Sequence, residues 1–271
     1  GSRPLAAKIA GEVFNLNYVP LRDKESQPDR PSIRRAMAAS RGEVHLLRYH
    51  DPVGKDVYSR TVQFVLFLAL RRLWPRADVK MNCTLGTGLY ISVSNAAHFS
   101  ASELKDEVNR IVRQDIPLLR RRITTQEAVT YFETDGQLDK ARLLQWREES
   151  YFDIYAHEDF LDYYYGETAP STGYLPSWDI IDAPGGFIFV FPDDADPARV
   201  SRYQEMPNFF SVFSEGERWG QLMECETVAD LNDLVSTGRI RELIRVNEAL
   251  HEKRYSQVAD MVCQRGAKVV M

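Results

Sequence analysis

One apolar segment, TVQFVLFLAL from Thr61 to Leu70, sets the strongest limit on how this 271-residue chain can fold. Arginines stand at both of its ends, and it is only about half as long as the ~20 residues that a membrane-spanning helix needs. Good helix formers fill positions Ser59 to Trp74, and Pro75 ends the run. We therefore expect a buried helix in the core of a soluble, cytoplasmic protein, with no membrane partner.

The composition fits a packed protein. Hydrophobic residues make up 44% of the chain, which allows a real core. The net charge is −5, so the chain as a whole does not attract nucleic acid, although a local basic face remains open. The three cysteines, Cys83, Cys225 and Cys263, are far apart and form no metal or disulfide pattern, which favours a reducing compartment.

Helix and strand signals both occur along the chain and predict an α+β fold. Residues 7–20 alternate around a glycine as a hairpin does, and residues 24–32 are polar and rich in turn formers. Further strands are expected from Glu43, at 78–83 and at 88–93, the last two joined by the turn LGTG.

The same kinds of local signal predict helices and strands in the rest of the chain. Capping patterns at Ser100 and Thr124 predict helix starts, and a third short helix is expected at 138–146. From Tyr151 to Pro192 the sequence is β-like, and after it the chain is predicted to be helical, with a last long helix over Ile240–Arg265. The final AKVVM is typical of a strand start, so we expect a piece of a longer protein.

Motifs for catalysis and metal binding are missing from the sequence. The histidines do not pair as HxxxH or HExxH, and a zinc site needs three or four converging ligands, so we expect no metal. The chain has no GxxxxGK[ST] phosphate loop and no GxSxG elbow, and the sequence indicates no general base for Ser171. We expect no catalytic residue.

The segment DYYYGETAPSTG, Asp162 to Gly173, draws attention because three tyrosines precede a turn. We expect a strand there that delivers side chains to the lip of a pocket. Asp162 and Glu167 are either a carboxylate pair or turn-capping residues.

Two arginine clusters are candidate RNA contacts, because cationic side chains can bind phosphates. The alternative is a solvated strand edge, which is the more common role of such an isolated arginine run. The candidates are Arg71, Arg72, Arg120, Arg121 and Arg122.

DFLDYYYGETAPSTG and the helix SRTVQFVLFLALRRLWP together resemble the second additional domain of threonyl-tRNA synthetases, an accessory domain that hydrolyses wrongly charged tRNA. In that family DLCRGPHVPSTG and an HxxxH helix carry the reactive groups. Here the two helix histidines correspond to Arg60 and Phe64, the cysteine to Tyr164 and the last histidine to Thr168. The turn formers are kept. The resemblance therefore implies the shell of a hydrolytic site without its metal ligands and proton-transfer groups.

Nearly the whole chain also resembles the amino half of uridine kinase-like proteins, through Tyr58–Thr61, PSTG and EALHEKRYSQVADMV. This implies a partial TGS-like, β-grasp piece at 1–50, a synthetase-like editing domain at 51–197, and a helical connector at 198–271 leading to a P-loop kinase domain in the same chain. That absent domain would bind ATP and Mg²⁺ and phosphorylate a nucleoside, whereas this segment is expected to need no cofactor.

Three functions follow as alternatives. The first is a non-catalytic regulatory or recognition region of a nucleoside kinase, whose altered pocket holds a small molecule such as a nucleotide or carboxylate. The alternative for this pocket is that Phe64 and Tyr164 only fill the volume of a former metal site and bind no ligand. The second is an RNA- or tRNA-binding module, and the third is a surviving aminoacyl-tRNA deacylase with a rebuilt site. The candidate pocket residues are Arg60, Phe64, Asp162, Tyr164, Thr168, Ser171 and Thr172.

Overall fold

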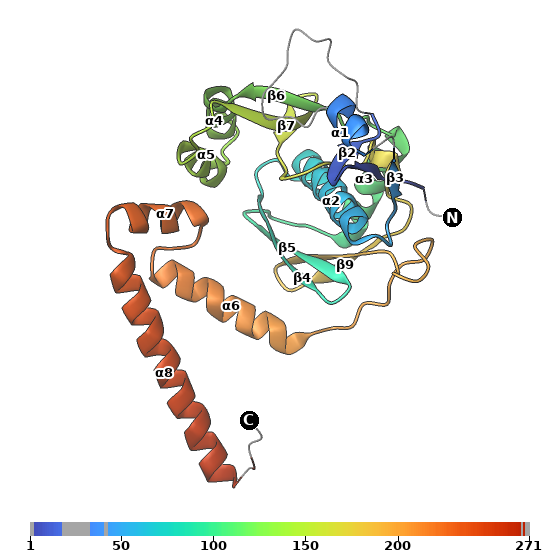
Figure 1. Cartoon of the computed structure of the whole chain (residues 1–271). Coiled ribbons are helices and arrows are strands. Elements are labelled where there is room, and N and C mark those ends of the chain that lie inside the picture. The colour runs from blue at the N-terminus through green and yellow to red at the C-terminus, as the bar shows by residue number, and fades with distance from the viewer. Residues whose placement is uncertain (1–2, 18–32, 41–42, 267, 269–271) are drawn as a thin grey trace. The chain divides into compact units, whose positions relative to one another are not determined.

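The computed structural model describes residues 3–17, 33–40, 43–266 and 268. Contacts within the chain divide it into two compact units (Figure 1), one made of Gly1–Ile123 and Asp153–Met206, the other of Thr124–Phe152 and Pro207–Met271. The limits predicted after residues 50 and 197 come from a resemblance and stay predictions. The mixture of helices and sheets confirms the α+β class.

The first unit begins with a three-stranded sheet in the order β2-β1-β3. The predicted hairpin is confirmed, because β1 (Ala6–Ile9) and β2 (Glu12–Asn15) pair antiparallel around a turn with positive φ at Ala10 and Gly11. The predicted loop at 24–32 lies outside the described residues. Helix α1 (Ile33–Ala39) precedes β3.

Strand β3 (His45–Leu47) is shorter than the sequence suggests. The chain turns directly after it, because the Arg48 backbone N–H donates to the Asp51 carboxylate at 2.7 Å and the Asp51 N–H donates to the Arg48 carbonyl at 3.0 Å. The predicted strand through His50 is therefore wrong at its end.

Helix α2 (Pro52–Leu73) is the predicted buried helix, but it begins at Pro52 rather than at Ser59. Proline fits the first turn of a helix because its missing N–H is not needed there. Gly54 allows the early start, since a Cβ at that position would lie 1.8 Å from the Arg48 carbonyl oxygen. Half of the 22 residues of α2 are buried, and Trp74 beyond its end stacks on Phe187 at 5.9 Å.

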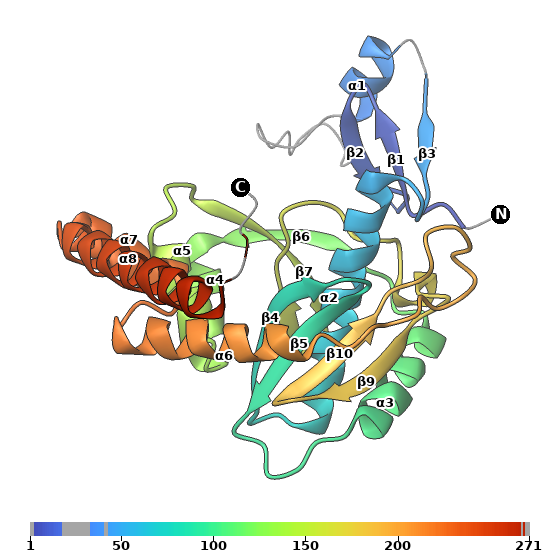
Figure 2. The ribbon, with the colours of Figure 1, turned by 90° about the horizontal axis from the view of Figure 1, so that it is seen from below.

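A four-stranded antiparallel sheet forms the other wall of this core, in the order β4-β5-β10-β9. Helices α2 and α3 (Ala101–Gln114) lie on one of its faces (Figure 2). LGTG is confirmed as the hairpin turn, while the predicted strand at 78–83 continues to Leu85 after a register shift between Met81 and Thr84. The strands are β4 (Asp78–Leu85), β5 (Gly88–Ser94), β9 (Asp179–Ala183) and β10 (Gly186–Val190).

The third sheet has the order β6-β7-β8, with β6 at Arg120–Thr124, β7 at Tyr151–His157 and β8 at Phe160–Asp162. Strand β8 ends before the three tyrosines, so the predicted strand through them is wrong. The Tyr163 N–H donates to the side chain of Asp162 at 2.8 Å and turns the backbone there. A short 3-10 turn, η1, follows at Thr172–Tyr174.

The second unit is mostly helical. The helix starts predicted at Ser100 in the first unit and at Thr124 here are both confirmed, the latter with a complete capping box to Glu127. The tail predicted to be helical after Pro192 begins its first helix only at Pro207. The helices of this unit are α4 (Thr125–Thr134), α5 (Leu138–Gln145), α6 (Pro207–Leu222), α7 (Val228–Ser236) and α8 (Ile240–Arg265).

Two further predictions concern membrane-spanning helices and the C-terminal segment AKVVM. Among the residues described, no helix has the length and apolar character to cross a membrane. The strand start predicted at AKVVM falls almost wholly outside the described residues, so it stays a prediction.

Candidate functional site around Asp162 to Gly173

The structure brings the segment 162–173 against helix α2, as the two-part resemblance implies. The Arg60 Nε donates to the Glu167 carbonyl at 2.8 Å. The Ala169 N–H donates to Thr61 Oγ1 at 2.8 Å, and that buried hydroxyl donates in turn to the Val57 carbonyl. Thr61 was not predicted as a site residue. A threonine inside a buried helix, able to bond the carbonyl four residues earlier, is the signal that could have found it.

The PSTG end of the segment is tied to the end of α3. Asp115, the helix cap, has a left-handed backbone with φ 48 and accepts hydrogen bonds from the Ser171 hydroxyl and from the Gly173 N–H. Thr172 Oγ1 accepts from the Ile116 N–H at 2.9 Å and donates to the Ile111 carbonyl at 2.8 Å. The hydroxyls of Ser171 and Thr172 therefore hold the backbone of the turn.

Side chains fill the interior next to this segment. Phe64 has no exposed surface and packs edge-to-face on Phe160 at 5.3 Å, and Thr168 is equally buried. The Tyr164 hydroxyl donates to Asp162 Oδ2 at 3.2 Å, and burial raises the pKa of Tyr164 well above its usual range, with the Asp162 charge adding to the effect. Where the resemblance has two helix histidines, a thiol and a last histidine, this chain therefore has the guanidinium of Arg60, a buried phenyl ring, a phenol and a buried hydroxyl.

Arg60 is the one predicted site residue that combines charge with partial exposure. Its guanidinium lies against Gly166, whose φ is 130, and a Cβ there would lie 2.9 Å from Arg60 Cζ. Burial lowers the pKa of Arg60, while the negative charge of Asp56 and Glu167 opposes that shift, so the group stays cationic. Within the described residues only its Nε makes a hydrogen bond, which leaves the two terminal nitrogens as free donors.

Two of the predicted RNA contacts are held by carboxylates inside the first unit. Arg120 donates hydrogen bonds to Glu167 and to Asp153, both at 2.6 Å. Arg122 donates two hydrogen bonds to the same Asp153, at 2.9 and 3.1 Å. Burial alone would lower the pKa of Arg120, but the charges of Glu167 and Asp153 raise it. Glu167 also accepts from the Tyr155 hydroxyl at 3.0 Å, so it pairs with Arg120 and Tyr155 rather than with Asp162.

The other predicted RNA contacts differ among themselves. Arg72 forms a 3.4 Å ion pair with the buried Glu107 and a 3.5 Å pair with Glu158. Arg71 is half-buried and has a partner of its own, whereas Arg121 is exposed. Of the run Arg120–Arg122, the outward-facing member is therefore Arg121.

A search for cation ligands in the part of the chain that the structure describes finds no place where three His, Cys, Asp or Glu side chains converge. Around residues 162–173, Arg60 offers terminal guanidinium nitrogens that can orient an anionic group.

Comparisons with known proteins place the chain beside one class of enzyme. No protein-family model matches it. It is 27% identical over 187 residues to a threonine–tRNA ligase of Desulforamulus reducens, covering 68% of this chain and 27% of that protein. It is 28% identical over 150 residues to a threonine–tRNA ligase of Carboxydothermus hydrogenoformans, covering 54% and 24%.

The chain therefore spans about a quarter of the length of the curated relatives it matches. It is similar to a part of threonine–tRNA ligases, in agreement with the synthetase resemblance of the helix and the PSTG segment. The second resemblance, to a nucleoside kinase region, gains no support from these relatives.

Proposed function

We propose that this chain is a tRNA-recognition module that shares its origin with a region of threonine–tRNA ligases and does not hydrolyse aminoacyl-tRNA itself. One observation carries the proposal: the chain is similar to such a ligase over 187 residues, whereas Phe64, Tyr164 and Thr168, which stand at the reactive positions in the resemblance, are packed within or against the core. The similarity supports contact with tRNA, and the packing supports the loss of hydrolysis.

Phosphate contact in this proposal falls to Arg60 and Arg121. Arg60 has two terminal nitrogens free within the described residues, and Arg121 is exposed. Arg120 and Arg122 are already paired with Asp153 and Glu167, so in this proposal they stabilise the folded chain and do not contact the nucleic acid. Two phosphate contacts give a shallow salt dependence, with a slope of log K against log salt of roughly −1.5.

The test is an anisotropy titration of unacylated tRNA with the full chain at several salt concentrations. We expect Arg121→Glu and Arg60→Gln each to weaken binding several-fold and to flatten the salt slope. Arg218→Glu on α6 makes the same charge change as Arg121→Glu at an exposed position far along the chain, and it should leave binding unchanged. Binding that is absent, or equally weakened by all three substitutions, would refute recognition at this face.

The deacylase alternative is tested on the same protein by following the ester bond of mischarged tRNA. The proposal expects no cleavage above the rate in buffer, with or without added zinc. Cleavage that disappears in Tyr164→Phe would instead favour the rebuilt hydrolytic site.

The nucleoside kinase region, with ATP and Mg²⁺ held by a further domain and a small ligand in the 162–173 pocket, is not part of this proposal. The pocket part of that hypothesis is open to test by adding nucleotides to the chain and measuring its melting temperature, because a ligand of the folded state raises it.

A further inference from the structure

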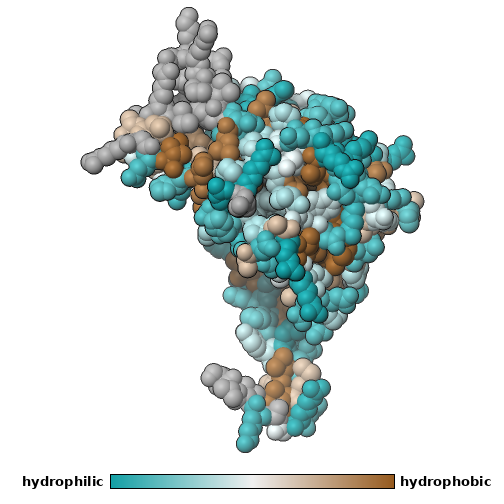
Figure 3. Space-filling model, turned by 90° about the vertical axis from the view of Figure 1, so that its right-hand side faces the viewer, coloured by the Kyte–Doolittle hydropathy of each residue, from teal (hydrophilic) through white to brown (hydrophobic). Residues whose placement is uncertain are grey.

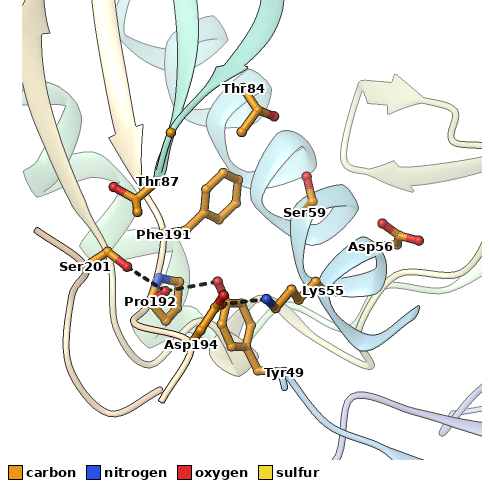
Figure 4. Close-up of a pocket in the computed structure, with 11 residues that line it drawn as sticks. Tyr49, Lys55, Asp56, Ser59, Thr84, Thr87, Phe191, Pro192, Asp194 and Ser201 are labelled. Carbon is orange, nitrogen blue, oxygen red and sulfur yellow. Dashed lines mark hydrogen bonds and ion pairs between the residues drawn. The ribbon is translucent and has the colours of Figure 1, made fainter. Parts of the chain in front are cut away.

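A second place in the first unit has the form of a binding site, and neither the resemblance nor the relatives assign it. It is a cavity of about 290 Å³ beside the first turns of α2 (Figure 4). Residues at the β4–β5 turn and in the segment after β10 complete its walls. Stretches that are far apart in the sequence therefore build the cavity together.

The charged side chains at the cavity are matched. Lys55 Nζ lies 2.6 Å from Asp194 Oδ1. Asp56 also borders the cavity, but its carboxylate points away from it (Figure 4), and its charge acts on Arg60. Among the described residues that line the cavity, no charge thus faces an occupant without a partner, and this favours an uncharged ligand.

Hydroxyl groups at the cavity supply both hydrogen-bond donors and acceptors. Ser201 donates to the Pro192 carbonyl at 3.0 Å, so its oxygen remains as an acceptor. The Thr84 hydroxyl makes no hydrogen bond with any described residue, and that of Ser59 only accepts one, from Gln63 at 3.5 Å. Thr84 and Ser59 can therefore donate to an occupant as well as accept from it.

The ring of Phe191 gives the cavity an apolar wall. It is half-buried and packs edge-to-face on Phe189, with 5.4 Å between the ring centroids. Figure 4 shows the ring between Thr87 and the helix that carries Ser59. The C–H face of a sugar ring can pack on such an aromatic surface while the sugar hydroxyls reach the polar groups around it.

We propose that this cavity binds a neutral polyol of the size of a monosaccharide. Its C–H groups pack on Phe191, and its hydroxyls exchange hydrogen bonds with Thr84 and Ser59. The Lys55–Asp194 pair adds further contacts, because an ammonium group has three N–H donors and a carboxylate has two acceptor oxygens. The cavity stands at the lower end of the size range of small-molecule sites, which fits a ligand with one ring.

Charged or apolar ligands fit the lining less well. An ammonium group would need an unpaired carboxylate and a phosphate an unpaired cation, whereas Lys55 and Asp194 neutralise each other. An apolar ligand would bury the hydroxyls of Thr84 and Ser59 without partners, at a cost in free energy. The site is independent of the tRNA proposal, since it uses neither Arg60 nor Arg121.

The test is saturation-transfer difference NMR of the full chain with D-glucose, D-galactose and D-mannose, which differ only in the direction of single hydroxyls. We expect at least one of these sugars to bind. The amino sugar and the uronate of the same configuration, which carry a positive and a negative charge, should bind no more tightly than the neutral sugar. Binding by none of the three sugars, or tighter binding of either charged analogue, would overturn the proposal.

Substitutions at the free hydroxyls locate the site. Thr84→Val and Ser59→Ala should each weaken binding of the sugar at least threefold, because each removes a donor with little change in shape. Thr134→Val, the same change as Thr84→Val at an exposed position on α4, should leave the affinity unchanged.

An unchanged affinity in Thr84→Val or in Ser59→Ala, or an equal loss in Thr134→Val, would also count against this site. Circular dichroism of each variant establishes that it is folded. If one variant at the cavity fails to fold, the other variant and the comparison of neutral with charged sugars decide.

Discussion

The two longest helices of the molecule have opposite environments. Helix α2 buries half of its 22 residues, including Phe64, whereas α8, with 26 residues, has no buried residue in the part of the chain described. Apolar side chains near the C-terminal end of α8, such as Val258 and Met261, are about half exposed. Figure 3 shows hydrophobic residues at the surface toward that end of the helix. The sequence predicts both as helices, the first from an apolar run of good helix formers ended by Pro75 and the second from the helical spacing of its apolar residues.

This difference shows that local sequence signals indicate that a helix forms, but not whether its apolar face is covered. The α2 face contributes to one continuous core together with residues of the three sheets and of α3. The α8 face contacts α6 through polar pairs such as Trp219 Nε1 to Asn247 at 2.9 Å. The following predictions test how far this contrast extends.

The largest effect is expected from truncation of the α2 core. Phe64→Ala should lower the free energy of unfolding of the first unit by about 3–5 kcal/mol, because it leaves a cavity at a fully buried site. Val258→Ala on α8 should change stability by less than about 0.5 kcal/mol. Urea denaturation of both variants measures the difference, and similar losses would mean that the α8 face is covered in solution.

A smaller effect should come from the arginine–carboxylate cluster. Asp153→Asn leaves Arg120 and Arg122 without their shared carboxylate, and we expect a loss of about 3 kcal/mol. Arg121→Gln, the exposed neighbour, should cost less than about 0.5 kcal/mol. The same denaturation experiment checks both, and a neutral Asp153→Asn would show that Arg120 and Arg122 are available to outside partners.

Gly166→Ala tests the contact between α2 and the 162–173 segment. The change combines a φ of 130, which favours glycine, with a Cβ that would lie 2.9 Å from Arg60 Cζ, so we expect a loss of about 2 kcal/mol. Gly11→Ala has a positive φ but no atom within 4 Å of the new Cβ, and it should cost about 1 kcal/mol less. Equal melting temperatures for the two variants would contradict close packing of Arg60.

The smallest effect is a pH dependence in the second unit. Burial by itself would raise the pKa of Asp230, but hydrogen bonds from Thr227 and Arg142 outweigh it and hold that pKa below the ordinary value of an aspartate. A carboxyl with a lowered pKa in the folded state stabilises the fold above its unfolded pKa, and this contribution is lost as the pH falls through the folded value.

We therefore expect α7 to lose about 1 kcal/mol of stability as the pH drops below about 4. Asp230→Asn should flatten this part of the profile, and Arg142→Gln should flatten it less. Far-ultraviolet circular dichroism during acid titration is the measurement, and an unchanged profile in Asp230→Asn would argue against the capping role.

Local signals in the sequence predicted much of the fold. The caps at Ser100 and Thr124, the LGTG hairpin and the buried helix each depend on residues a few positions apart, and the structure confirms them. The early start of α2 was missed because it depends on Gly54 approaching Arg48, and the end of β8 because it depends on a side chain of the strand itself.

The candidate site was predicted less completely, because its partners are distant in sequence. Arg60 meets Glu167 across 107 residues, and Thr61 meets Ala169 across 108. The sequence placed Arg60, Tyr164 and Thr168 near one another only through the resemblance. It could not indicate that Arg120 and Arg122 face Asp153 while Arg121 faces solvent.

By itself the sequence indicated most of the helices and strands, and which residue types stand where the resemblance has its reactive groups, since both depend on the order of residues along the chain. Tertiary structure alone decided which charges are neutralised. A guanidinium 2.6 Å from a carboxylate is matched and one facing water is free, and that distance depends on how separate elements pack.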